Sequence, residues 1–227
     1  MAPRGDVPVT RWVVVVPVKT ATAGKTRLAG VLPESHRQAL VRAMALDTVA
    51  AAVATRGVVR VLVVTADEPV RLGLPTGAEA VDEPSPTTRP AGAVEPGLDA
   101  AVLAGADRAA ALDPGAGVAV LLGDLPALRP DDLAAALDLA AHRPRTVVAD
   151  LGGTGTTLLT VAPGLDLRPR FGAGSAAAHE ALGHVRLDVP GTSSLRRDVD
   201  VPVDLARAAH DAGPRTRAVL GDVAPRG

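Results

Sequence analysis

The stretch from Trp12 to Leu28 constrains the fold of this chain more than any other. It begins with the apolar run Trp-Val-Val-Val-Val-Pro and continues into a loop of small residues that carries three cations, Lys19, Lys25 and Arg27. An apolar run without alternation is typical of a strand buried on both faces, as in parallel sheets covered by helices. Ligands of such sheets bind beyond the carboxyl ends of the strands. The stretch therefore predicts a strand followed by an anion-binding loop.

The composition makes this loop more specific, because Lys19 and Lys25 are the only lysines among 227 residues. The loop is not a P-loop, since GxxxxGK[ST] requires glycine where Lys19 stands, and it lacks GxGxxG. We interpret it as a Lys/Arg loop that neutralises a polyphosphate through its side chains. The alternative is that the three cations are surface charges of an ordinary strand-to-helix connection.

Length and composition limit the class of protein. A chain of 227 residues with 47% hydrophobic residues is expected to form one large domain. The net charge of −1 and the two aromatic residues, Trp12 and Phe171, argue against a nucleic-acid partner. The absence of cysteine excludes disulfides, thiolate zinc sites and a cysteine nucleophile. No signal peptide or membrane-spanning segment is expected, so we expect a cytoplasmic protein without a membrane partner.

Strands and helices are expected to alternate along the chain. Apolar runs predict strands over 58–65, 117–122 and 146–150, and a short strand is expected over 79–82. Periodic apolar residues predict a helix over 33–55, and further helices are expected over 98–111 and 176–182. The proline-rich segment over 83–92 is expected to be an ordered loop at the sheet edge. This alternation predicts an α/β fold, with a single Rossmann-like, mostly parallel sheet flanked by helices.

Asp124 is the strongest candidate for a metal ligand, because it follows a buried strand in the turn Gly-Asp-Leu-Pro. A carboxylate at that position, facing a cationic phosphate loop, suits Mg²⁺, which binds through one or two carboxylates and substrate phosphates. Asp131 and Asp132 are interpreted as first-turn acids that oppose the dipole of the next helix.

Two further acids, Asp198 and Asp200, alternate on an extended segment and so point to one side. One of them is a candidate for the second carboxylate of the metal site, and a solvated acidic turn is the alternative. Asp204 is interpreted as a helix-start residue.

Two loops of small residues, Gly152–Thr157 and Phe171–Ser175, are candidates for binding an anion through backbone N–H groups. For the first loop the alternative is a flexible turn between two strands. For the second, Ser175 is either a simple helix N-cap or part of an anion site at the helix start. His179, one turn into that helix, is interpreted as structural, and a ligand role is the alternative.

Five motifs in order carry a resemblance to a known family: VVPVKxxxxxKTRL, GDLPAL, GTGTT, FGxGS and DVDxPxDL. Together they resemble the guanylyltransferases that activate a phosphorylated three-carbon acid in the biosynthesis of coenzyme F-420. The resemblance implies a GT-A-like nucleotidyltransferase domain over 12–212, between an N-terminal extension over 1–11 and a C-terminal tail over 213–227. It leaves a homodimer open.

The resemblance also implies the reaction, in which GMP passes from GTP to the acid and pyrophosphate leaves. The Ala/Arg/Val/Gly/Pro bias suggests an actinobacterial member, for which the implied acceptor is phosphoenolpyruvate and the product enolpyruvyl-diphospho-5'-guanosine. The alternatives are 2-phospho-L-lactate and 3-phospho-D-glycerate. The acceptor's phosphate oxygen would attack the α-phosphorus in line, and an ionised phosphate needs no general base.

The family's functional positions carry over residue by residue. The catalytic cations on the GTP phosphates correspond to Lys19, Lys25 and Arg27. The Mg²⁺ ligands correspond to the catalytic Asp124 with Asp200, and Asp198 is the rival for the second place. The acceptor's carboxylate and phosphate correspond to Thr156, Gly172, Gly174 and Ser175. One departure is Leu98-Asp99, where the family is expected to have Leu-Asn.

Two other classes of function remain open at this point. A sugar-1-phosphate or molybdopterin-type nucleotidyltransferase would keep the fold and the metal, but the Thr156 and Ser175 loops suit a smaller, doubly anionic acceptor. A non-catalytic nucleotide-sensing module would keep the lysine loop, but it would not need the paired aspartates Asp124 and Asp200.

Overall fold

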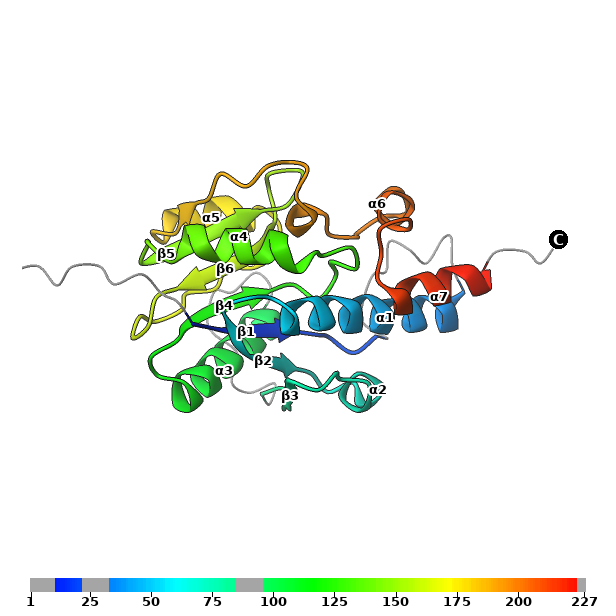
Figure 1. Ribbon diagram of the computed structural model, residues 1–227, viewed down its shortest axis with the longest axis horizontal. Helices are drawn as coiled ribbons and strands as arrows, with labels where there is room; N and C mark the ends of the chain where they lie inside the picture. Colours follow the sequence, from blue (N-terminus) through cyan, green and yellow to red (C-terminus); the bar gives the residue numbers. More distant parts are fainter. Residues whose placement is uncertain (1–10, 22–32, 85–95, 224–227) are drawn as a thin grey trace, which may run out of the picture.

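The computed structural model describes residues 11–21, 33–84 and 96–223. Its centre is a seven-stranded sheet in the order β3-β2-β1-β4-β6-β5-β7, covered by helices on both faces (Figure 1). The strands are β1 (Trp12–Pro17), β2 (Val58–Val64), β3 (Ala78–Val81), β4 (Gly117–Leu121), β5 (Arg145–Ala149), β6 (Thr156–Val161) and β7 (Val185–Arg186). The predicted α/β fold with a mostly parallel sheet is confirmed.

The directions of the strands bring the polar loops to one edge of the sheet. Strands β1, β2, β3 and β4 are parallel to one another, whereas β6 runs antiparallel to both β4 and β5. Where two neighbouring strands run antiparallel, the end of one strand lies beside the start of the other. The ends of β1, β2, β4 and β5 and the start of β6 therefore share one edge, which we call the site edge.

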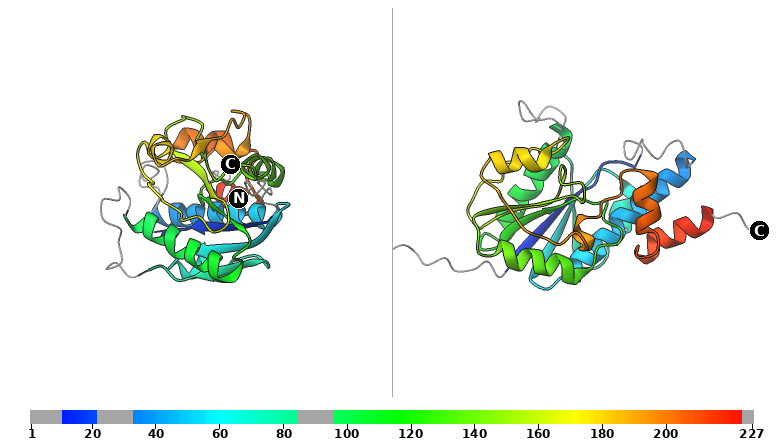
Figure 2. Two further views of the ribbon diagram at one scale, coloured as in Figure 1. Left: turned by 90° about the vertical axis from the view of Figure 1, so that its left-hand side faces the viewer. Right: turned by 90° about the horizontal axis from the view of Figure 1, so that it is seen from above.

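The helices divide between the two faces of the sheet (Figure 2), where α1 and α4 cover one face and α3 and α5 the other. The helices are α1 (Glu34–Val53), α2 (Glu68–Leu72), α3 (Pro96–Leu112), α4 (Pro130–Ala140), α5 (Ser175–Ala181), the 3-10 helix η3 (Ser194–Arg196), α6 (Pro202–Ala208) and α7 (Pro214–Val223). Within the described residues, no helix has the length and apolar character needed to cross a membrane.

Strand β1 shows why the first apolar run has no alternation. All six of its residues are buried. Val14 and Val16 belong to the core under α1 and α4, whereas Val13 and Val15 belong to the core under α3. Both faces of this inner strand therefore need apolar side chains.

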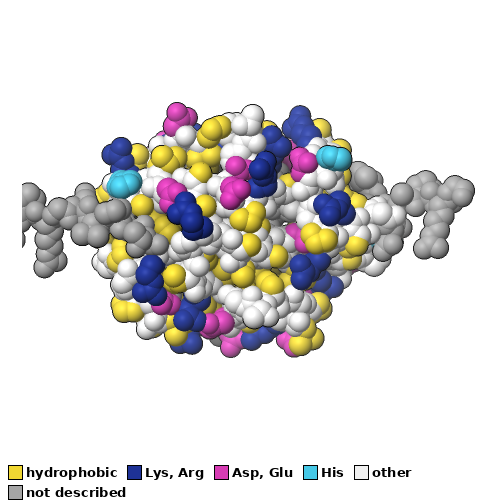
Figure 3. Space-filling model, viewed as in Figure 1, with side chains coloured by type: hydrophobic (Ala, Val, Ile, Leu, Met, Phe, Trp, Pro, Cys, Tyr) yellow, Lys and Arg dark blue, Asp and Glu magenta, His cyan; other side chains and the backbone are white. Residues whose placement is uncertain are grey.

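Charged and apolar side chains are mixed on one face of the molecule (Figure 3). On the face drawn in Figure 3, acidic and basic side chains are interspersed with apolar and uncharged ones. This mixture agrees with the near-zero net charge of −1. The described side chains of that face therefore form no basic surface of the kind that binds nucleic acid.

Helix α7 lies in the segment that the sequence assigns to a C-terminal tail, and it packs against α1. Its first turn is held by the buried Asp47, whose carboxylate accepts hydrogen bonds from the backbone N–H groups of Thr216 (2.8 Å) and Arg215 (3.3 Å). A Cβ atom at Gly213 would lie 2.4 Å from Cγ of Asp47. Glycine is therefore required for this close approach.

We predict that Asp47→Ala lowers the free energy of unfolding by about 1–3 kcal/mol, because it leaves buried backbone donors of α7 without an acceptor. Urea unfolding followed by circular dichroism measures this change.

Asp138→Ala is the matched control for that variant. Asp138 pairs with Arg56 at the surface, where both side chains are largely exposed, so its loss should change the unfolding free energy by less than about 0.5 kcal/mol. Equal losses in the two variants would show that Asp47 does not anchor α7.

Candidate functional site

The site edge brings together the polar residues that follow neighbouring strands. Lys19 follows β1, Asp67 follows β2 and Asp124 follows β4. Lys19 is exposed to solvent. The other two predicted cations of its loop, Lys25 and Arg27, lie outside the described residues, and so does most of the proline-rich segment over 83–92. Their roles stay predictions.

Three carboxylates form a compact cluster at this edge. Asp124, Asp198 and Asp200 each offer an oxygen, and these oxygens lie within 4.8 Å of one another. Asp124 and Asp198 are half-buried, and Asp200 is exposed. Like charges at this distance repel unless a cation or a proton lies between them. Because hard divalent cations take oxygen ligands, the cluster fits a divalent metal ion.

The backbone explains why the two acids of the 198–200 segment face Asp124. The N–H group of Val199 donates to the backbone oxygen of Asp124 (3.0 Å), and the Val199 side chain is buried against α1 and α6. Neighbours of a buried residue in an extended segment point the other way. Asp198 and Asp200 are thereby turned out of the core and toward Asp124.

Helices α1 and α4 hold the two loops of the cluster in place. The hydroxyl of Thr48 in α1 accepts a hydrogen bond from the N–H group of Leu125 (3.1 Å), next to Asp124. The carboxylate of Asp132 in α4 accepts from the N–H (2.8 Å) and hydroxyl (2.5 Å) groups of Ser194. Asp132 is thus structural, as predicted, but through a long-range contact.

Asp204 also has the predicted structural role. Its carboxylate accepts hydrogen bonds from the N–H groups of Asp200 (3.2 Å) and Val201 (3.1 Å). Its Oδ1 lies 3.8 Å from Nη1 of Arg207. These contacts fix the first turn of α6, so Asp204 supports the cluster without belonging to it.

A cavity of about 650 Å³ opens beside the cluster, between the turn after β5 and α6. This volume lies in the range of small-molecule sites. Its wall carries four acids and two arginines, and it is lined by Asp150, Leu151, Gly152, Gly191, Arg197, Asp198, Asp200, Asp204, Arg207 and Ala208. Because two of the clustered carboxylates line it, the cavity and the cluster form one site.

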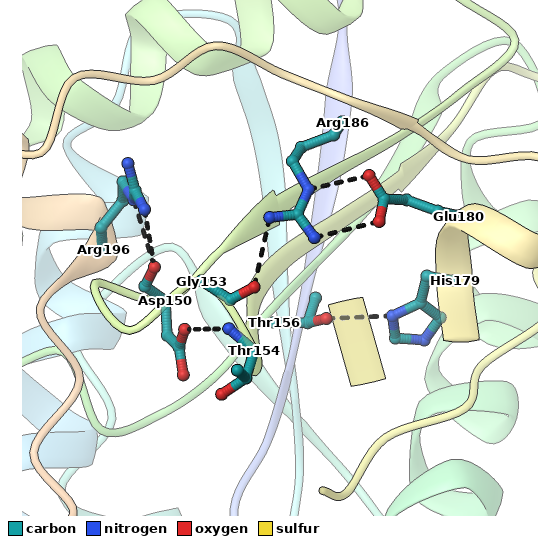
Figure 4. A network of polar contacts seen from close by, with 8 residues as sticks. All are labelled: Asp150, Gly153, Thr154, Thr156, His179, Glu180, Arg186 and Arg196. Atoms are coloured by element: carbon teal, nitrogen blue, oxygen red, sulfur yellow. Dashed lines mark hydrogen bonds and ion pairs between the residues drawn. The ribbon is translucent and has the colours of Figure 1, made fainter. Parts of the chain in front are cut away.

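The turn between β5 and β6 is organised around Asp150 (Figure 4). Its carboxylate accepts hydrogen bonds from the N–H groups of Thr154 and Gly155, both at 2.9 Å, and Arg196 donates to its backbone oxygen. A Cβ atom at Gly155 would lie 2.5 Å from Oδ2 of Asp150. These two N–H groups are already bonded within the chain, so for them the structure favours the alternative interpretation, a turn between two strands.

The two loops expected to bind the acceptor meet at Thr156. The Ser175 hydroxyl donates to Oγ1 of Thr156 (3.0 Å), and Nδ1 of His179 lies 3.0 Å from the same oxygen. The exposed fractions of Thr156, Ser175 and His179 are 2%, 3% and 0%. Gly172 and Gly174 have φ angles of 120° and 74°, in the left-handed region that favours glycine. They form the turn that brings Ser175 to β6.

Asp99, the departure from the family pattern, contacts this same loop. It is buried in α3, and its Oδ1 accepts a hydrogen bond from the N–H group of Phe171 (3.0 Å). The residue therefore ties α3 to the loop that carries Gly172, Gly174 and Ser175.

Asp67 is a structural anchor of the site that the sequence interpretation missed. Its carboxylate accepts hydrogen bonds from Arg42 (2.9 Å) and from the N–H groups of Ala21 (3.1 Å) and Val70 (3.2 Å). Burial raises the pKa of Asp67, but these hydrogen bonds outweigh that effect and leave its pKa below the ordinary value. The available signal was its position after β2, which matches that of Asp124 after β4.

Comparison with known proteins points to one family. The family described as "Guanylyl transferase CofC like" matches residues 12–205. The phosphoenolpyruvate guanylyltransferase of Sanguibacter keddieii is 49% identical over 246 residues, covering 92% of this chain and 84% of the relative. That of Salinispora arenicola is 48% identical over 221 residues, covering 94% and 95%.

A solved structure has the same fold at much lower identity. It is a provisionally assigned nucleotide-diphospho-sugar transferase from Desulfovibrio desulfuricans G20, with a TM-score of 0.61 and 15% identity. The match covers 93% of this chain and 94% of that chain. At this identity the likeness concerns the fold alone, and it agrees with the predicted GT-A-like architecture.

We predict that Asp124→Asn weakens the binding of Mn²⁺ at least about tenfold. Removal of a group that only hydrogen-bonds to a metal ligand already causes a loss of this size at metal sites. Titration followed by electron paramagnetic resonance of free Mn²⁺ measures the affinity.

Asp131→Asn is the matched control, because it removes the same charge from an exposed acid in the first turn of α4, outside the cluster. It should bind Mn²⁺ like the unmodified chain. Equal affinities in all three proteins would show that Asp124 is no metal ligand.

A further prediction concerns the stability of the folded chain at low pH. Burial, aided by repulsion from His184, lowers the pKa of His179 to about 4. An unfolded histidine titrates near 6.5, so between these values the unfolded chain binds more protons and unfolding is favoured as the pH falls. His179 should therefore cost about 3 kcal/mol of stability between pH 6.5 and pH 4.

Urea unfolding at several pH values tests this, with His179→Asn as the comparison. Burial also lowers the pKa of His184, so the variant should still lose some stability on acidification. Its loss should nevertheless be smaller than that of the unmodified chain. Parallel losses would contradict the assignment of the pH dependence to His179.

Proposed function

The chain belongs to the CofC-like guanylyl transferase family and is therefore a nucleotidyltransferase, and on this premise we propose that it transfers GMP from GTP to phosphoenolpyruvate. Pyrophosphate leaves, and the product is enolpyruvyl-diphospho-5'-guanosine, an intermediate of coenzyme F-420 biosynthesis. The observation that supports this best is the convergence, at one edge of the sheet, of the carboxylate cluster, Lys19 and the Thr156–Ser175 pair.

The nucleotide side of the site would be the charged side. Lys19, Lys25 and Arg27 are suited to the GTP phosphates, since lysine acts as a mobile point charge and arginine as a planar fork. Asp67 supports this assignment, because its bond to the N–H group of Ala21 fixes the described start of the loop.

Asp124 would hold Mg²⁺ together with Asp200 or Asp198, whose oxygens are close enough to share one ion. Magnesium at this place supplies neutralisation of the charge on the reacting phosphates. The protein's own contribution is to hold the three carboxylates on fixed backbone, through the contacts of Val199 and Thr48.

The acceptor side would be the neutral side. Thr156 presents its hydroxyl group, to which the Ser175 hydroxyl donates, and Gly172 and Gly174 form the turn, with positive φ angles, that brings Ser175 to β6. Neutral donors bind a small carboxylate and phosphate without adding charge. The reaction needs no general base, because the attacking phosphate oxygen is already ionised near neutral pH.

Pyrophosphate release from GTP tests the proposal directly. The chain is supplied with Mg²⁺, GTP and one of three acids: phosphoenolpyruvate, 2-phospho-L-lactate or 3-phospho-D-glycerate. We expect turnover with phosphoenolpyruvate at the highest kcat/KM. Preference for another of the three acids would replace phosphoenolpyruvate as the proposed acceptor. Turnover with a sugar 1-phosphate alone would contradict the proposed class of acceptor.

We predict that the two sides separate kinetically. Thr156→Val should raise the KM for phosphoenolpyruvate about tenfold to a hundredfold, equivalent to about 1.5–3 kcal/mol for one hydrogen bond to a charged group. Its GTP affinity, measured by calorimetry, should stay nearly unchanged. Lys25→Ala should instead weaken GTP binding and slow the chemical step.

Thr55→Val is the control for the loss of a buried threonine hydroxyl. Thr55 lies between α1 and β2 at the opposite edge of the sheet, and its hydroxyl donates only to Ala51 within the described contacts. Both KM values should stay unchanged in this variant. If Thr156→Val lost GTP binding as strongly as Lys25→Ala, the division of the site would be wrong.

A further inference from the structure

His179 has an unusual environment for a residue interpreted as structural. The ring is fully buried on α5, yet both of its nitrogens have polar neighbours (Figure 4 shows the contact with Thr156). Nδ1 lies 3.0 Å from Oγ1 of Thr156, and Nε2 accepts a hydrogen bond from the backbone N–H group of Arg170 (2.9 Å). The Phe171 ring packs against it in a T-shaped arrangement, with 5.0 Å between the ring centroids.

These contacts determine the tautomer of the ring. A backbone N–H group can only donate, so Nε2 of His179 must carry a lone pair where it faces Arg170. A neutral imidazole then carries its proton on Nδ1, and that N–H group donates to Oγ1 of Thr156. The buried position and the lowered pKa, about 4, keep the ring neutral at physiological pH.

The same reasoning determines what the Thr156 hydroxyl can do. Its oxygen has two lone pairs and one proton. One lone pair accepts from His179, and the other accepts from the Ser175 hydroxyl at 3.0 Å. Because both lone pairs are occupied, the hydroxyl of Thr156 is left as a donor.

We propose that His179 is a positioning residue, which keeps the Thr156 hydroxyl oriented as a hydrogen-bond donor for the anionic acceptor. The inference rests on the proposed function, because it assigns Thr156 to the acceptor. A hydroxyl that is free to rotate presents a lone pair as readily as its proton, and a lone pair repels an anion. Holding it as a donor removes that reorganisation from the binding step.

The position of Arg170 adds a second effect of the same ring. Arg170 immediately precedes the loop that carries Gly172, Gly174 and Ser175, and its N–H group is bonded to Nε2 of His179. His179 thus joins that loop to the first residue of β6 through its two nitrogens. The two nitrogens can be tested separately.

Two substitutions separate the positioning contact from the structural one. Asparagine carries its amide near the place of Nδ1, and glutamine carries it near the place of Nε2. His179→Asn should keep a donor to Thr156 and lose the contact with Arg170. His179→Gln should keep an acceptor for Arg170 and lose the donor to Thr156.

The readouts are the KM for phosphoenolpyruvate, the calorimetric Kd for GTP and the unfolding free energy. We expect His179→Gln to raise this KM at least about fivefold, whereas His179→Asn stays within about twofold, with GTP binding unchanged in both. In a Thr156→Val background, His179→Gln should add nothing to the KM. An unchanged KM in His179→Gln, or equal increases in both variants, would overturn the proposal.

The tautomer is measured on the unmodified chain, so the test does not depend on a variant that folds. Long-range ¹H–¹⁵N correlation spectra distinguish Nδ1–H from Nε2–H among the five histidines. We expect the Nδ1–H form for His179, and the Nε2–H form would overturn the proposal.

Failure of the proposed function would look different. A chain that transfers no GMP to phosphoenolpyruvate contradicts the proposed function, and the role of His179 toward that acceptor falls with it. Normal turnover by the unmodified chain, with equal KM effects in the two His179 variants, overturns the positioning role alone.

Discussion

The antiparallel pairing of β6 with β4 is the constraint on which the site depends. Leu158 lies opposite Leu121, and the N–H group of Leu122 donates to the backbone oxygen of Thr157 (3.1 Å). A parallel strand at this place would start at the opposite edge. Because β6 is reversed, Thr156 lies at the edge where β4 ends. The neutral residues around Thr156 and the charged residues around Asp124 therefore lie at the same edge of the sheet.

The fold and the carboxylate cluster were largely predictable from the sequence, and the reason is local. A strand buried on both faces needs an unbroken apolar run, as β1 and β4 have. The end of such a run marks the end of the strand, so the position of Asp124 after β4 could be inferred from the sequence alone. The alternation around Val199 likewise predicted that Asp198 and Asp200 share a side. Both signals depend on neighbours in the sequence.

The polar contacts that support the site could not be predicted in the same way. Asp67 reaches Ala21, which is 46 positions away, and Asp99 reaches Phe171, which is 72 positions away. Such pairs depend on the order of the strands and on the packing of α3, which no local pattern encodes. His179 illustrates the limit, because a lone helical histidine has the same sequence signature whether or not it orients a neighbouring hydroxyl.

The hydrogen bonds that attach the segments after β7 have a consequence for the synthesis of the chain on the ribosome. The backbone oxygens of Asp124 and Pro126 accept hydrogen bonds from Val199 (3.0 Å) and Gly213 (2.8 Å), residues that the ribosome adds after all seven described strands. During vectorial synthesis the sheet strands are made first, and the carboxylate cluster is completed only once the 198–200 segment is available. A prematurely terminated chain could thus form much of the sheet and still lack the cluster.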